Sequence, residues 1–174
     1  MTEHAVANFE ALILPHLDSA YTFARYIMRD EHDAQDAVQE AALRAFRGFS
    51  SYRGGDPRSW LLVIVRNVCF TSIRRHRGEQ LRPLPHENGT AALVDPRSAD
   101  EGAIAESDAV AIREAVASLP VEFREVIILR ELQGLSYAEI GEIVGIPLGT
   151  VMSRLSRGRR GLSQRLAHLT RGVG

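Results

Sequence analysis

Residues 136–166, SYAEIGEIVGIPLGTVMSRLSRGRRGLSQRL, constrain the fold of this chain more than any other stretch. Ser136 precedes Glu139 by three residues, the spacing at which both side chains bind backbone amides at the start of a helix. Gly145 suits the left-handed residue that ends a helix, while Pro147 cannot continue that helix but can open the next. The stretch therefore predicts a helix, a tight turn and a second helix.

The second predicted helix of this motif has one apolar face and one basic face. Its inward positions are Val151, Leu155, Leu162 and Leu166. The rest of its surface carries no acid and five arginines, Arg154, Arg157, Arg159, Arg160 and Arg165. An arginine-rich helix end can be only a solvated terminus that suits the helix dipole. This density of positive charge also suits nucleic acid, which makes DNA the predicted partner.

Positive charge is segregated along the 174 residues, although the net charge is only -1. Residues 51–80 carry six arginines and two acids, and residues 151–174 carry six arginines and no acid. The segments before each of them are acidic: residues 1–50 have eight acids and four arginines, and residues 81–150 have twelve acids and five arginines. Two basic segments separated by acidic ones indicate a protein that contacts DNA twice.

The first fifty residues have the period of amphipathic helices. Apolar residues recur at helical spacing from Phe9 to Met28 with a break or kink at Pro15, which predicts one bent helix or two. Asp33 is expected to cap the next helix. Its predicted buried stripe is Val38, Ala41, Ala42, Ala45, Phe46 and Phe49. Its predicted exposed patch is Asp36, Gln39, Glu40 and Leu43, and both a solvated face and a protein-binding surface remain open for it.

Residues 50–56, SSYRGGD, are predicted to form a glycine-containing loop. Asp56 as N-cap and Pro57 at the first helical position then begin another helix. Its expected inward residues are Trp60, Leu61, Ile64, Val65, Val68 and Cys69. A different face carries Arg66, Phe70, Arg74 and Arg77. A cationic stripe with an aromatic ring suits unstacked bases; the alternative is an amphipathic core helix with a basic tail.

Residues 79–107 combine prolines, glycines and an acidic excess with no sustained period, which predicts a flexible linker. The helical pattern returns from residue 108, is interrupted at Pro120 and ends at Gly134. The predicted fold is therefore all-α, with two small helical domains at residues 1–78 and 108–174 joined by that linker.

Composition excludes several other classes of protein. The lone Cys69 excludes an internal disulfide framework and leaves no zinc-site spacing. No apolar run approaches the ~20 residues that cross a bilayer, and no signal core follows a charged start. We therefore expect no cofactor, no metal, no membrane insertion and a cytoplasmic location.

The order of these segments resembles the extracytoplasmic-function (ECF) sigma factors of the bacterial sigma-70 family. The resemblance rests on DAQDAVQEAALRAF, then SSYRGGDPRSWLLVIVRN, then LPVEFREVIILRELQGLSYAEIGEIVGIPLGTVMSRLSRGRRGL. It implies sigma region 2 in residues 1–78 and sigma region 4 in residues 108–174. The implied function is non-enzymatic: to confer promoter specificity on core RNA polymerase and initiate transcription of a stress- or signal-responsive regulon.

The resemblance also implies a role for each predicted surface. The surface expected to bind the clamp helices of the largest polymerase subunit is Asp36, Gln39, Glu40 and Leu43. The residues expected to bind and melt the minus-ten element, with one base flipped into the loop, are Ser51, Tyr52, Arg53, Asp56, Arg66, Asn67, Phe70, Arg74 and Arg75. Those expected to recognise the minus-thirty-five element are Thr150, Ser153, Arg154, Arg157 and Arg160.

Further partners follow from the same resemblance. Region 4 is expected to meet the flap of the second polymerase subunit. Because the sequence ends soon after region 4, we expect no fused C-terminal sensory domain, and control by an anti-sigma factor instead.

Three other functions are weaker interpretations of the sequence. A helix-turn-helix regulator that acts without core polymerase leaves the acidic patch and the SSYRGGD loop without a role. A sigma mimic that sequesters an anti-sigma factor does not need two arginine-rich DNA faces. An enzyme would need a nucleophile triad, a phosphate loop or paired carboxylates, and the sequence shows no such arrangement.

Overall fold

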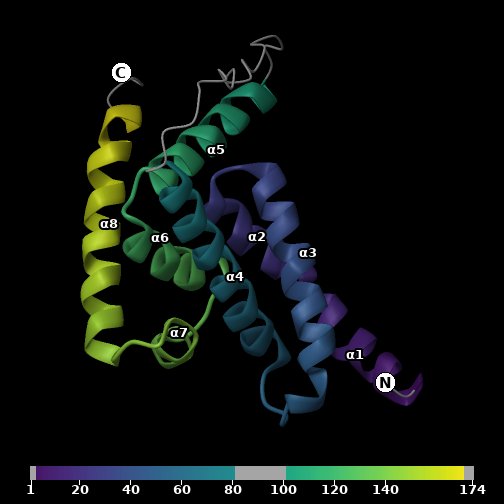
Figure 1. The fold of residues 1–174 in the computed structure, drawn as a ribbon. Coiled ribbons are helices and arrows are strands. Elements are labelled where there is room, and N and C mark those ends of the chain that lie inside the picture. The colour runs from purple at the N-terminus through teal and green to yellow at the C-terminus, as the bar shows by residue number, and fades with distance from the viewer. Residues whose placement is uncertain (1–2, 81–100, 171–174) are drawn as a thin grey trace.

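The computed structural model describes residues 3–80 and 101–170, and every regular element in these ranges is helical (Figure 1). The N-terminal half contains α1 (Glu3–Ile13), the 3-10 turn η1 (Leu14–His16), α2 (Leu17–Met28), α3 (Glu31–Gly48), the 3-10 turn η2 (Phe49–Ser51) and α4 (Pro57–Gln80). The C-terminal half contains α5 (Glu101–Ala117), α6 (Val121–Ile127), the π-helical turn η3 (Ile128–Leu132), α7 (Tyr137–Val144) and α8 (Leu148–Thr170). The prediction of an all-α fold is confirmed.

Local sequence signals place most helix ends. Pro15 lies in η1 and separates α1 from α2, so the first predicted segment forms two helices. The predicted cap of α3 is wrong, because Asp30 caps this helix by accepting a hydrogen bond from the Asp33 amide at 2.9 Å. This backbone hydrogen bond lowers the pKa of Asp30. The helix begins earlier than expected because Arg29 ends α2 in the left-handed conformation, with φ 67°, directly before the cap.

The start of α4 agrees with its prediction. The Asp56 carboxylate accepts a hydrogen bond from the Ser59 amide at 2.8 Å, and Pro57 is the first residue of the helix. Gly54 and Gly55 before it have positive φ values of 92° and 95°, as the loop composition suggested. Helix α4 runs to Gln80 and α5 begins at Glu101, so helical residues enter the predicted linker at both ends. The remaining residues of the predicted linker, 81–100, lie outside the part of the chain that the structure describes.

The interior of the N-terminal half is apolar. Helices α2, α3 and α4 pack against one another, and the alanines of α3 at positions 34, 37, 41 and 45 allow them to approach closely. The predicted stripes need correction, since Val38, Ala42, Phe46, Phe49, Trp60 and Ile64 are only half-buried, whereas Ala34, Ala37 and Leu62 are buried. Cys69 is fully buried, and this burial raises the pKa of its thiol to about 12. It is therefore an unreactive core residue.

In the C-terminal half, α8 packs along α5, α6 and α7. Two glycines inside α8 allow this contact. A Cβ atom at Gly158 would lie 2.7 Å from Ile127 Cγ1, and one at Gly161 would lie 2.8 Å from Leu119 Cδ2. The reason for both glycines is therefore close packing of α8 against Ile127 and Leu119.

The two halves pack against each other. Contacts between them join α2 to α5 and α6, and α4 to α7, with α4 in the centre of the molecule (Figure 1). One continuous cluster of buried apolar residues includes members of both halves. No helix in residues 3–80 or 101–170 is both long enough and apolar enough to cross a membrane.

Candidate nucleic-acid interface

Helices α7 and α8 form the predicted helix-turn-helix motif. Ser136 Oγ accepts a hydrogen bond from the Glu139 amide at 3.2 Å, and the Glu139 carboxylate accepts one from the Ser136 amide at 2.7 Å. These hydrogen bonds lower the pKa of Glu139. Gly145 ends α7 in the left-handed conformation, with φ 75°. The carbonyl of Pro147 then accepts the first amides of α8, so both ends of the turn agree with the prediction.

Helix α8 exposes three of the five residues predicted to recognise the minus-thirty-five element. Val151 and Leu155 are fully buried. The predicted DNA-contacting residues Ser153, Arg157 and Arg160 are exposed, and Thr150 and Arg154 are half-buried. Two further arginines of α8 already have partners in the protein. Arg159 forms an ion pair with Glu131 at 2.7 Å, and Arg165 donates to the carbonyls of Gly161 and Ser118.

The basic face predicted for the minus-ten element lies along α4. The guanidinium of Arg66 stacks over the Phe70 ring, 4.5 Å from its centroid. Asn67, Arg74 and Arg75 are exposed on the same helix. Arg66 itself is half-buried and turns toward the C-terminal half.

The loop before α4 is held by an aromatic cluster. The ring of Tyr52 stacks on Phe49 at a centroid distance of 5.8 Å and lies 5.3 Å from the Trp60 ring. The hydroxyl of Tyr52 donates to the Gly55 carbonyl at 2.7 Å. Ser51, Arg53 and Asp56 are exposed. In this conformation Tyr52 therefore stabilises the loop, while Ser51, Arg53 and Asp56 face solvent.

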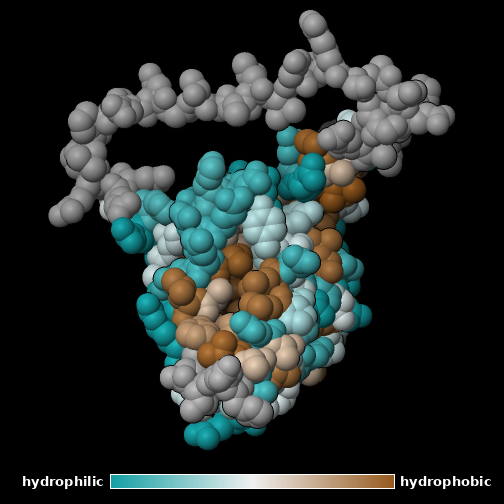
Figure 2. Space-filling model, turned by 90° about the vertical axis from the view of Figure 1, so that its right-hand side faces the viewer, coloured by the Kyte–Doolittle hydropathy of each residue, from teal (hydrophilic) through white to brown (hydrophobic). Residues whose placement is uncertain are grey.

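The patch predicted to bind polymerase lies on the open face of α3. Asp36, Gln39 and Leu43 are exposed, with Leu43 exposed to 49%, and half-buried Glu40 pairs with Arg44 at 2.6 Å. Figure 2 shows the side of the molecule that carries α1 and α3, where apolar residues gather among polar ones. An apolar residue within a polar patch of this kind suits contact with another protein.

The structure brings together two residues that the sequence assigned to different DNA elements. Arg66 donates to the Glu125 carboxylate through Nε at 2.7 Å and Nη2 at 3.2 Å, and Arg154 Nη1 lies 3.4 Å from the same group. Glu125 is almost fully buried. Burial raises its pKa, and the hydrogen bond and charge of Arg66 and the charge of Arg154 oppose this rise without cancelling it.

Sequence reasoning missed Glu125 and two other buried polar residues. Arg124 donates to the Ile27 carbonyl at 3.0 Å, and Gln133 bonds Ser19 and Arg58. Each of these contacts crosses between the halves. The available signal was a charged pair, Arg124 and Glu125, at the start of an apolar run in FREVIIL. Apolar runs of this kind are buried, so a charge within one needs a partner.

Comparison with known proteins identifies both halves. Residues 12–79 match the family model described as Sigma-70 region 2, and residues 109–162 match the one described as Sigma-70, region 4. The chain is 36% identical to the ECF RNA polymerase sigma factor SigM of Mycobacterium tuberculosis, over 95% of this chain and 80% of SigM. The chain belongs to the ECF sigma factors.

Other relatives agree with this assignment. This ECF sigma factor is 35% identical to SigE of Mycolicibacterium smegmatis over 94% of its own length, and it spans 63% of the length of SigE. Its fold resembles the sigma factor RpoE of Bartonella quintana, solved in complex with the anti-sigma factor NepR, with a TM-score of 0.71 and 28% identity over 92% of this chain and 97% of RpoE. CnrH, solved with the cytosolic domain of CnrY, is 23% identical and shows a likeness of fold alone, with a TM-score of 0.63 over 92% of this chain and 88% of CnrH.

Proposed function

We propose that this ECF sigma factor gives core RNA polymerase its promoter specificity in the cytoplasm and initiates transcription of a stress- or signal-responsive regulon. In this proposal α8 recognises the minus-thirty-five element, and residues 50–56 with α4 bind and melt the minus-ten element. The observation that supports it most is the presence of an arginine-rich face in each of the two matched regions, 12–79 and 109–162. The protein binds and positions, and it catalyses no reaction itself.

The proposal requires the two halves to separate. Arg66 and Arg154 approach the same carboxylate, so they lie side by side. Their proposed targets are centred about 25 base pairs apart, which is about 85 Å along B-DNA at 3.4 Å per base pair. The two arginines therefore cannot contact both elements in this conformation. We infer that it is a closed form and that polymerase and promoter select an open one.

We propose three protein contacts as well. The patch of Asp36, Gln39, Glu40 and Leu43 would bind the clamp helices of the largest polymerase subunit, and region 4 would bind the flap of the second subunit. An anti-sigma factor would hold the protein inactive. This last proposal draws support from RpoE of Bartonella quintana, which was solved in complex with an anti-sigma factor. The structural match to this chain covers 97% of RpoE.

Transcription with purified core polymerase on promoter-bearing templates tests the proposal directly. We expect specific initiation that needs both core polymerase and this protein. Tight DNA binding by the protein alone, with no initiation on any template, would instead favour a repressor-like regulator.

A finer test concerns two arginines of α8. Replacing half-buried Arg154 with alanine should relax discrimination at one minus-thirty-five position by about 1 to 3 kcal/mol. Replacing exposed Arg160 with alanine should weaken binding to all sequences alike, since a phosphate contact carries no base information. Binding measured against a set of single-base variants separates the two results. Equal losses that ignore sequence would remove the base-reading role of Arg154.

A further inference from the structure

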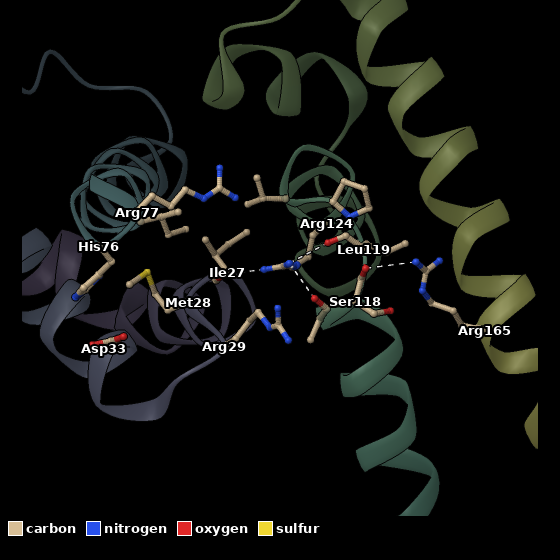
Figure 3. Close-up of a pocket in the computed structure, with 14 residues that line it drawn as sticks. Ile27, Met28, Arg29, Asp33, His76, Arg77, Ser118, Leu119, Arg124 and Arg165 are labelled. Carbon is tan, nitrogen blue, oxygen red and sulfur yellow. Dashed lines mark hydrogen bonds between the residues drawn. The ribbon is translucent and has the colours of Figure 1, made fainter. Parts of the chain in front are cut away.

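A cavity of about 770 Å³ lies between the two halves, and its walls are strongly cationic (Figure 3). The end of α2, the start of α3 and the end of α4 line one side, and the α5–α6 turn with part of α8 lines the other. The charged and titratable residues in its wall are Arg29, Asp33, His76, Arg77, Arg124 and Arg165. Four arginines therefore face one aspartate.

Arg124 is the buried centre of this wall. Its side chain donates to the carbonyls of Ile27, Ala117 and Leu119 at 2.9 to 3.0 Å, while its Nε is buried without a hydrogen-bond partner. The residue is only 6% exposed, and no carboxylate of the described residues forms an ion pair with it. Burial, and then the charge of Arg29, lower its pKa to about 10. A buried cation that has only carbonyls as partners would gain from a nearby anion.

Arg29 supports the same interpretation. It is the one non-glycine residue in the described part with positive φ, at a helix end where glycine or asparagine is usual. Figure 3 shows the guanidinium groups of Arg29 and Arg124 near each other, while that of Arg77 lies apart from them in the same wall. Neither Arg29 nor Arg77 pairs with a carboxylate among residues 5–78 and 107–167, whose side chains the structure describes. The wall thus carries an excess of positive charge, with Asp33 as its one carboxylate among the lining residues.

We propose that this cavity binds a small anion with two or more phosphate groups, held between the two halves. Arginine guanidinium groups match phosphate oxygens in geometry and charge, and several of them suit more than one phosphate. The volume also leaves room for an organic group against Leu119 and Ile73, which lie in the same wall. Because both halves contribute to the wall, the bound anion favours the closed form by mass action. An effect of the anion on promoter binding would rest on the proposed sigma function. Binding of the anion to this cavity does not.

Titration calorimetry of the full chain with inorganic pyrophosphate tests this site. We expect saturable binding of one pyrophosphate per chain. Arg29→Gly and Arg77→Gln should each weaken the affinity by about tenfold, since each removes one charge-assisted contact. The control is Arg47→Gln, which removes an exposed charge from the end of α3, outside this cavity, and should leave the affinity unchanged. No saturable binding, or an equal loss in the control, would overturn the proposal.

The Arg29→Gly variant separates a ligand site from a structural role. Glycine adopts a φ of 67° without strain, so the variant should melt at the same temperature as the wild type or above it while binding pyrophosphate less tightly. A lower melting temperature with unchanged affinity would instead show that Arg29 serves the fold. A parallel titration with a nucleoside triphosphate identifies the source of the phosphates. Tighter binding than pyrophosphate indicates a nucleotide, and equal binding indicates the phosphate group alone. None of these measurements depends on whether the protein directs initiation.

Discussion

The interiors of the two halves and the interface between them are built from different residues. Inside the N-terminal half the buried side chains are apolar, from Phe23 at the centre to the alanines of α3. The buried polar side chains of the described residues are Arg124, Glu125 and Gln133. Each of them contacts the N-terminal half, at the Ile27 carbonyl, at Arg66 and at Ser19. Polarity is therefore concentrated where the halves meet.

This difference indicates which contacts can be exchanged. Apolar packing is lost only when a core opens to water, because no other partner replaces it. A buried ion pair loses nearly as much by desolvation as it gains by attraction, so its net contribution to stability is small. Arg66 and Arg154 could therefore leave Glu125 for DNA phosphates at modest cost. The halves also share apolar packing, since one cluster of buried apolar residues includes members of both, so exchange of these ion pairs would be one part of opening.

The largest effect should come from the apolar interior. Phe23 is fully buried between the helices of the N-terminal half, so Phe23→Ala should lower the free energy of unfolding by about 3 to 5 kcal/mol. Urea unfolding followed by circular dichroism measures this change. Val110, which is 40% exposed, provides a control, since Val110→Ala should change stability by about 0.5 kcal/mol or less. A loss below about 1 kcal/mol for Phe23→Ala would contradict the assignment of this core.

Substitutions at the glycines of α8 test the packing inside the C-terminal half. In Gly158→Ala the new Cβ would lie 2.7 Å from Ile127 Cγ1, and overpacking of this kind costs about 1 to 3 kcal/mol. The better helix propensity of alanine offsets about 1 kcal/mol of this cost, so we expect a net loss of up to about 2 kcal/mol. Gly149 is the matched control in the same helix, because its Cβ would meet nothing within 4 Å. Thermal unfolding should show Gly149→Ala stabilised and Gly158→Ala destabilised, and the same sign for both would refute close packing as the reason for Gly158.

Sequence reasoning predicted the elements whose signals are local. The capping box of Ser136 and Glu139, the left-handed Gly145 and the Asp56 cap depend on residues within a few positions of each other, and all three are confirmed. The cap of α3 was wrong although it is also local. Asp30 and Asp33 were both suitable, and the left-handed Arg29 before Asp30, which the sequence did not reveal, decided between them.

The interface between the halves was beyond local signals. Glu125 meets Arg66 at a separation of 59 residues and Arg154 at a separation of 29. Periodicity predicts which face of a helix is buried, but it does not predict which other face covers it. The roles expected for Arg66 and Arg154 in DNA binding stay predictions, and the structure adds that these two residues meet at one carboxylate.

A smaller effect should follow from changes at that carboxylate. Glu125→Gln keeps the shape of the side chain but removes its charge. Because burial raises the pKa of Glu125 in the closed form, that form should gain modestly from a neutral side chain at this position. The open form should then become less populated, and affinity for a minus-thirty-five duplex should fall modestly. Fluorescence anisotropy with labelled DNA measures the affinity, and energy transfer between the halves measures opening.

The control for this change is Glu122→Gln, which removes an exposed charge from the same helix. It alters the net charge equally and should leave the separation of the halves unchanged. Equal changes in DNA affinity for both variants would show that net charge, and not the buried position of Glu125 between the halves, is responsible.

The smallest effect is a dependence of closure on pH. Burial raises the pKa of Glu125 in the closed form, whereas the open form would return it toward its ordinary value of 4.5. The closed form therefore binds a proton more tightly, and its advantage from this group is complete below pH 4.5 and is lost as pH rises through the raised pKa. Energy transfer between the halves should increase modestly as pH falls from 7 toward 5, and Glu125→Gln should remove the change. Opening on acidification would mean that the ion pairs with Arg66 and Arg154 outweigh burial, so that the interface depends on the charged form of Glu125.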